Sequence, residues 1–89
     1  MFRYLVEAYV PRARSGQSDV QEGRVLRIAT KLTGEGSAVR VIRTTSIPED
    51  DTCFYVVEAD SIEVVRELCV HAGLQSARVV EAFENPPDR

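Results

Sequence analysis

The sequence predicts one small α+β domain whose elements follow the order strand, helix, strand, strand, helix, strand. Segments that alternate with period two, as half-buried strands do, are interleaved with segments of helical period. A short phrase also recurs, since Tyr4-Leu5-Val6-Glu7-Ala8 is echoed by Tyr55-Val56-Val57-Glu58-Ala59 and more briefly by Val79-Val80-Glu81-Ala82. The echo indicates two similar strand–helix–strand units within one domain of residues 1–89.

The first unit runs to about residue 46. Residues 2–10 alternate and are rich in aromatic and β-branched types, which indicates a strand. Ser18 and Gln21 fit a capping box that opens a helix, and Gly34 and Gly36 end that helix, one of them in a left-handed conformation. Residues 37–46 form the second strand. The core-facing stripe of the helix is Val25, Ile28, Ala29 and Leu32.

The second unit repeats this pattern after a charged turn from Pro48 to Asp51. Residues 52–59 form a strand, and Ser61 supplies a capping signal for a helix that Gly73 ends. Residues 77–83 form the last strand, and residues 84–89 are a tail whose prolines cannot continue a sheet. The inward stripe of this helix is Ile62, Val65, Leu68, Cys69 and Ala72.

Two such units with right-handed crossovers predict a ferredoxin-like βαββαβ fold. Its antiparallel sheet has the strand order 4-1-3-2, and both helices lie on one face. We expect the first and third strands to lie side by side and parallel at the centre of the sheet. Glu7 and Glu58 would then be near neighbours, with Glu81 on the flanking strand.

The two faces of the predicted sheet differ in composition. The helix-covered face should hold Tyr4, Val6, Ala8, Tyr55, Val57, Ala59, Val80 and Ala82. The other face mixes apolar with charged residues, which makes it a candidate binding surface and a candidate dimer interface. Its expected members are Leu5, Glu7, Tyr9, Phe54, Val56, Glu58, Val79, Glu81 and Phe83.

The three glutamates of that face are the principal candidate site. Glu7, Glu58 and Glu81 could line a pocket for a metal, an amine or a general base, with Tyr9 and Phe54 as apolar walls. Carboxylates this close would raise one another's pKa or recruit a cation. The alternative is a dimer interface or a solvated sheet surface, in which Arg3, Arg40 or an arginine of the partner protomer is the counter-ion.

A second candidate lies on the later helix, where Glu63, Glu67 and His71 recur every four residues. Oxygen and imidazole donors on one stripe would suit nickel or zinc, although the same spacing is common on a solvated helix face. Cys53 and Cys69 lack the spacing of a zinc or redox motif, so we expect both to be small buried side chains.

Composition and hydropathy restrict the classes of partner and the cellular location that we expect for the chain. The net charge of −3 argues against nucleic acid, and no apolar run approaches the roughly 20 residues that span a bilayer. The N-terminal residues do not form a signal peptide, because Arg3 and Glu7 interrupt the apolar stretch. We therefore expect a cytoplasmic protein.

Several short motifs resemble a family of small bacterial proteins of unknown function whose named representative is a nickel-binding protein. The resemblance implies a ferredoxin-like fold, a homodimer formed through the open sheet face, and nickel binding, with Cys53 and the glutamates as the positions that could transfer. The matching segments are Arg3-Tyr4-Leu5-Val6-Glu7, Asp51-Thr52-Cys53-Phe54-Tyr55, Glu58-Ala59, Ser61, Glu63-Val64-Val65-Arg66, Ala72-Gly73-Leu74 and Val80-Glu81.

Three functions remain open from the sequence. The first is a non-enzymatic homodimer that binds a small ligand or a divalent metal such as nickel, through Glu7, Glu58, Glu81 and His71. The second is a small enzyme of the dimeric α+β-barrel kind, in which a sheet-face glutamate acts as base. The third is a protein interaction module whose acidic second half meets a basic partner.

Overall fold

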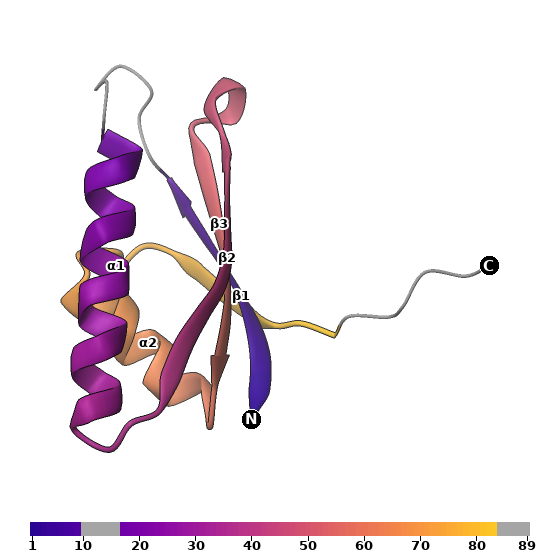
Figure 1. Cartoon of the computed structure of the whole chain (residues 1–89). Helices are drawn as coiled ribbons and strands as arrows, with labels where there is room; N and C mark the ends of the chain where they lie inside the picture. The colour runs from indigo at the N-terminus through magenta and orange to yellow at the C-terminus, as the bar shows by residue number, and fades with distance from the viewer. Residues whose placement is uncertain (10–16, 84–89) are drawn as a thin grey trace.

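Two helices pack on one face of a four-stranded sheet in the computed structural model, which describes residues 1–9 and 17–83. Neither described helix covers the opposite face (Figure 1). The loop before the first helix and the tail at 84–89 lie outside the described residues. The elements are β1 (Phe2–Tyr9), α1 (Gln17–Gly34), β2 (Val39–Ile47), the 3-10 turn η1 (Pro48–Asp50), β3 (Thr52–Ala59), α2 (Ile62–His71) and β4 (Arg78–Glu81).

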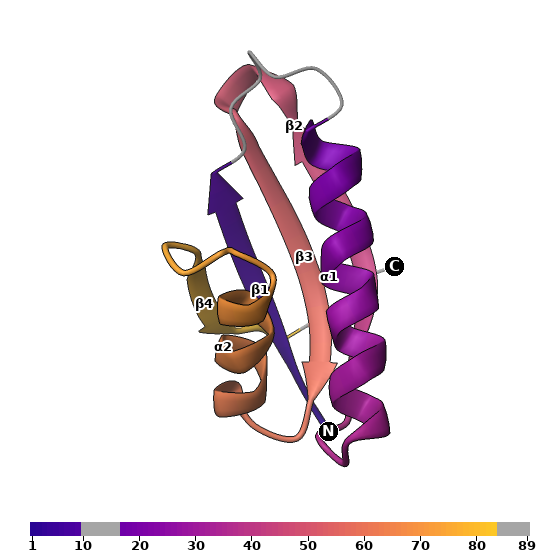
Figure 2. The same ribbon diagram turned by 90° about the vertical axis from the view of Figure 1, so that its left-hand side faces the viewer.

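The sheet is open and antiparallel, with the strand order β2-β3-β1-β4, which reads 4-1-3-2 from the β4 edge. This arrangement is consistent with a ferredoxin-like fold. The expectation that β1 and β3 run parallel is wrong, as their opposed arrows in Figure 2 show. The cause lies in the connections: α1 brings the chain back so that β2 runs parallel to β1, and η1 then reverses the direction into β3.

The register of β4 corrects a second expectation. β4 pairs with β1 so that Glu81 lies opposite Tyr4 and Val80 opposite Leu5. Residues directly opposite each other share a face. Glu81 is therefore on the helix side of the sheet, where Val79 packs against the core, while Val80 is on the uncovered side. A shift of one residue exchanges the two faces of a strand, so the echoed phrase does not keep the facing it has in β3.

The core lies between the helices and the sheet, and it confirms both predicted helix stripes. On α1 and α2 the buried side chains follow the expected 3.6-residue spacing, with Ile28 and Ile62 partly buried at the margin. The edge strand β2 contributes less, and its register shifts between Val41 and Arg43. The buried apolar residues are Tyr4, Val6, Ala8, Val25, Ala29, Leu32, Val39, Cys53, Tyr55, Val57, Ala59, Val65, Leu68, Cys69, Ala72 and Leu74.

One polar pair is buried in this core. α1 begins at Gln17, one residue before the expected N-cap Ser18. Gln21, which we expected to reach back to the helix start, is buried, and its Oε1 accepts a hydrogen bond of 3.3 Å from Tyr55 Oη. Burial raises the pKa of Tyr55, and nearby Cys53 raises it further, so the phenol remains a donor.

Neither described helix is long and apolar enough to cross a membrane.

Both helices are followed by a glycine in a left-handed conformation, which was expected after α1. Gly36, after α1, has φ +100°, and Gly73, after α2, has φ +81°. Next to Gly73, Arg24 Nη1 donates a hydrogen bond of 3.4 Å to Ala72 O, which links α1 to the end of α2. A cation at a helix C-terminus also interacts favourably with the helix dipole.

We expect Gly73→Ala to lower the free energy of unfolding by about 1–2 kcal/mol, because a side chain disfavours positive φ. The new Cβ would also lie 3.3 Å from Arg24 Nη1, which the guanidinium can relieve by a small shift. Gly36→Ala is the matched control, since it meets the same backbone penalty with no atom within 4 Å of its Cβ. Urea unfolding of both variants tests this, and wild-type stability of Gly73→Ala would contradict it.

Candidate functional site on the sheet

The uncovered side of the sheet carries the alternate side chains of all four strands, a surface that we call the open face. Its membership follows from the register, because directly opposite residues project to the same side. Its members are Arg3, Leu5, Glu7 and Tyr9 of β1, Arg40, Arg43, Thr45 and Ile47 of β2, Thr52, Phe54, Val56 and Glu58 of β3, and Arg78 and Val80 of β4.

The centre of the open face is apolar. Leu5 on β1 lies directly between Val56 on β3 and Val80 on β4, and all three side chains are partly exposed. We call these three residues the apolar trio. Phe54, two residues before Val56, extends the apolar surface along β3, and Tyr9 is 68% exposed at the end of β1.

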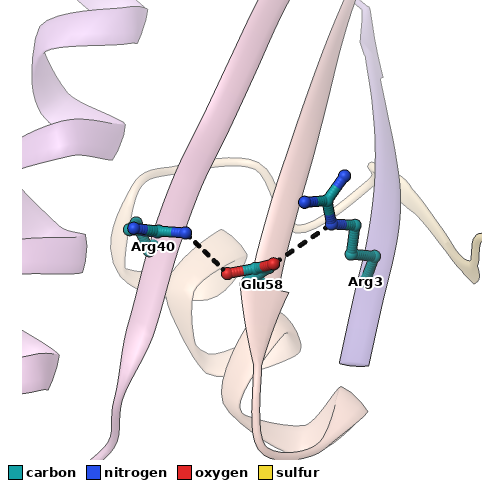
Figure 3. Close-up of polar contacts among 3 residues, drawn as sticks. All are labelled: Arg3, Arg40 and Glu58. Carbon is teal, nitrogen blue, oxygen red and sulfur yellow. Dashed lines mark hydrogen bonds and ion pairs between the residues drawn. The ribbon is translucent and has the colours of Figure 1, made fainter. Parts of the chain in front are cut away.

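An ion-pair cluster lies at one end of the open face, where Glu58 bridges two arginines from the neighbouring strands (Figure 3). Glu58 Oε2 accepts a hydrogen bond of 3.1 Å from Arg3 Nε, and Oε1 accepts one of 2.9 Å from Arg40 Nη2. The bond from Arg3 lowers the pKa of Glu58, desolvation opposes it, and Arg40 lowers the pKa further. Arg3 and Arg40 were both named as possible counter-ions in the alternative interpretation, and both are paired with Glu58, which is a doubly paired carboxylate.

Glu7 lies toward the other end of the open face, next to Tyr9 and Phe54, the two predicted pocket walls. It is opposite Phe54 on β3 and Arg78 on β4, and Arg78 Nη1 is 3.8 Å from Glu7 Oε1. Glu58 is instead opposite Arg3, four residues from Glu7, which corresponds to about 13 Å along the strand. The expected proximity of Glu7 and Glu58 is therefore wrong, because antiparallel pairing places the two echoed phrases in opposite directions.

Glu81, the third predicted carboxylate, does not belong to the open face. It lies on the helix side near Tyr4, whose pKa is raised by burial and by the negative charges of Glu81 and Glu63. The three glutamates thus occupy three separate environments. A single pocket lined by all of them is not formed.

His71 lies on α2, away from the sheet glutamates. Its Nε2 is 3.8 Å from Glu67 Oε2, and both side chains are about half exposed. Within residues 1–9 and 17–83, no three side chains of His, Cys, Asp or Glu gather as a metal site. Of the predicted ligands Glu63, Glu67 and His71, the last two form this contact.

The two cysteines are free and buried, as expected. Cys53 is on the helix side of β3, 1% exposed, with its Sγ 3.6 Å from Ser46 Oγ. Burial raises the pKa of Cys69 to about 11, so that thiol stays protonated near neutral pH. Thiolate is the form that binds metals, and Cys69 is therefore poorly suited as a ligand.

Sequence reasoning missed the abundance of arginine on this surface. Four arginines and two glutamates share the open face, whereas the whole chain has a net charge of −3. Arg78 could be placed on the open face, opposite Glu7, only once the β4 register was known.

No family model and no curated protein sequence matches the chain.

The lowered pKa of Glu58 predicts a specific dependence of stability on pH. A carboxylate with a depressed folded pKa stabilises the fold above its ordinary value of 4.5, and this contribution is lost as pH falls through the lowered folded value. We expect Glu58→Gln to lose less stability than wild type between neutral pH and this acid range. Urea midpoints over a pH series measure this, with exposed Glu49→Gln as the control. Identical pH profiles for wild type and Glu58→Gln would contradict it.

Proposed function

We propose that this chain is a non-enzymatic, ferredoxin-like binding protein that acts as a homodimer, with the open face of one protomer packed on the open face of its partner. The observation that carries the proposal is the apolar trio, which lies at the centre of a sheet face that neither described helix covers. Ion-paired residues flank it on both sides along β1. An apolar centre with a polar rim is the usual anatomy of a protein interface.

The size of the open face supports this role. β1 and β3 have eight residues, β2 has nine and β4 has four. At about 3.3 Å per residue and about 4.8 Å between strands, the face measures roughly 26 by 19 Å and is shorter at the β4 edge. Its planar area of roughly 450 Å² is of the same order of magnitude as the ~800 Å² per partner that specific interfaces bury. A chain of 89 residues also has only a modest core, so burial of a second sheet face would stabilise it.

The charges of the open face favour this proposal over the alternatives. A general base works best with a pKa near the operating pH, whereas the pKa of Glu58 is lowered. A divalent cation needs several ligands that converge, whereas Glu7 and Glu58 face separate arginine partners. Carboxylates that are already paired within the protomer can enter an interface without a new counter-ion.

Sedimentation equilibrium tests the proposal. We expect a mass twice that of the chain, with a dissociation constant on the order of 1 μM, which is usual for an interface of this size. A monomer at concentrations up to about 1 mM would overturn it.

The nickel binding that the family resemblance implies is tested separately. We expect thermal melting with nickel to differ from melting with EDTA by less than about 1 °C, because no three potential ligands gather within residues 1–9 and 17–83 and a ligand stabilises a fold only through a site it binds. His71→Ala is the matched variant, because it removes the sole histidine. A nickel-specific rise in Tm that His71→Ala removes would contradict this expectation.

A further inference from the structure

A groove of about 640 Å³ runs between α1 and the edge strand β2, outside the apolar trio. Pockets of about 300–1,000 Å³ are typical of sites for small organic molecules. Leu26, which lines the groove, is 45% exposed although its side chain is large and apolar. The lining comprises Leu26, Ala29, Thr30 and Thr33 of α1, Ala38, Val39, Arg40 and Val41 at the start of β2, and Met1 and Glu58.

The hydroxyl groups that line the groove are already hydrogen-bonded within the chain. Thr33 Oγ1 donates to Val39 O at 2.9 Å and accepts from Val39 N at 3.1 Å. Thr30 Oγ1 donates to Leu26 O at 3.1 Å. The lining is therefore mainly apolar toward a ligand, which suits a body of methylene groups or an aromatic ring.

One cation among the lining residues can bind a further anion. The Arg40 side chain is 70% exposed, and one of its N–H groups donates to Glu58 Oε1. A guanidinium carries five N–H donors, so this bond leaves capacity for a second acceptor. Glu58 lines the same groove, but its two oxygens already accept from Arg3 and Arg40, which limits its repulsion of an incoming anion.

The edge of β2 is less suited to a peptide strand. Its register shift between Val41 and Arg43 interrupts the regular ladder, and it carries Arg40 and Arg43. Irregular pairing and charged side chains are features that protect edge strands from added strands. These features favour a small molecule over strand addition as the occupant of the groove.

We propose that the groove between α1 and β2 binds an amphipathic organic anion, with its apolar body against Leu26 and Val41 and its anionic head on Arg40. A medium-chain carboxylate represents this class. The proposed ligand has one charged group, matched to the Arg40 guanidinium, because most of the other lining residues are apolar or internally bonded.

Titration of ¹⁵N-labelled protein with decanoate, followed by amide chemical shifts, tests the proposal. We expect saturable shifts in residues 26–33 and 38–41, and an affinity that rises about two- to four-fold for each methylene from octanoate to decanoate. Decyltrimethylammonium, which has the same chain length and the opposite charge, should bind at least about ten-fold more weakly. Shifts centred on the apolar trio, or equal affinity for both head groups, would overturn the proposal.

Two variants locate the site. Arg40→Gln should lower the affinity for decanoate about ten-fold, as the loss of a charge-assisted bond on an exposed residue does. Lys31→Gln removes the same charge from an exposed residue of α1 outside the lining, and should leave the affinity unchanged. Thr30→Trp, at an exposed helix position, should fill the groove and abolish binding while the spectrum remains that of a folded protein. Wild-type affinity in Arg40→Gln and Thr30→Trp would overturn the assignment.

Arg40 and Glu58 belong to both the open face and the groove lining, so decanoate binding is also measured on a monomer. A substitution in the apolar trio, such as Val56→Glu, changes the open face and no residue of the groove lining. Decanoate should therefore bind a monomeric Val56→Glu variant as it binds wild type. Loss of decanoate binding in that variant alone would place the ligand on the open face and contradict the groove.

Discussion

Leu68→Ala should lower the free energy of unfolding by about 2–5 kcal/mol. Leu68 is 2% exposed on α2, between Val65 and Cys69 of the same buried stripe. Truncation therefore removes apolar contacts and leaves a cavity that the close-packed neighbouring side chains cannot fill. A domain of this length has a total stability of roughly 4–13 kcal/mol, and the variant would lose much of it. Urea unfolding at a fixed protein concentration measures the change.

The matched control for this substitution lies two residues further along the same helix. Val70 is 54% exposed, so Val70→Ala changes helix propensity and little else, with an expected effect within about 0.5 kcal/mol. Similar losses in the two variants would show that α2 does not pack on the sheet as described.

Val56→Glu should convert the proposed dimer to a monomer, with a dissociation constant raised at least 100-fold. The substitution places a charge within the apolar trio of each protomer, and the desolvation penalty of a buried ion is several kcal/mol even beside a partner such as Arg43. In the monomer the new carboxylate is solvated and lies opposite Arg43 on β2, so the fold should tolerate it. Sedimentation equilibrium and far-ultraviolet circular dichroism on the same sample separate dissociation from unfolding.

Val70→Glu is the matched control, because it makes the same change on the exposed side of α2. It should leave the dissociation constant unchanged if the open face is the interface. A dimer that survives Val56→Glu and dissociates in Val70→Glu would place the interface on the helices.

The helix stripes were predictable because they depend on local spacing alone. Val25 and Leu32 on α1, like Val65 and Leu68 on α2, recur at helical period and are buried as expected. The alternating core residues of β1 and β3 are buried for the same reason. In a strand with one covered face, apolar and polar residues alternate, so the sequence predicts which side chains are buried.

The candidate site was less predictable because it depends on pairs distant in sequence. Glu7 and Glu58 occupy equivalent places in the echoed phrase, yet the direction of β3 is set by the reversal at η1. The face of the sheet on which Glu81 lies depends on how many residues connect α2 to β4, because a one-residue change in register moves every side chain of the strand to the other face. Arg3 and Arg40 could be named as counter-ions of Glu58, but their simultaneous bonds to it required the register of three strands.

The central claim is that two open faces pack together through the apolar trio. Its most direct test is an isotope-filtered nuclear Overhauser experiment on a mixture of ¹³C-labelled and unlabelled protein, which detects only contacts between protomers. We expect cross-peaks between the Leu5, Val56 and Val80 methyl groups of one protomer and the apolar trio of its partner. Cross-peaks that arise from α1 or α2 instead, or a sample that remains monomeric, would contradict it.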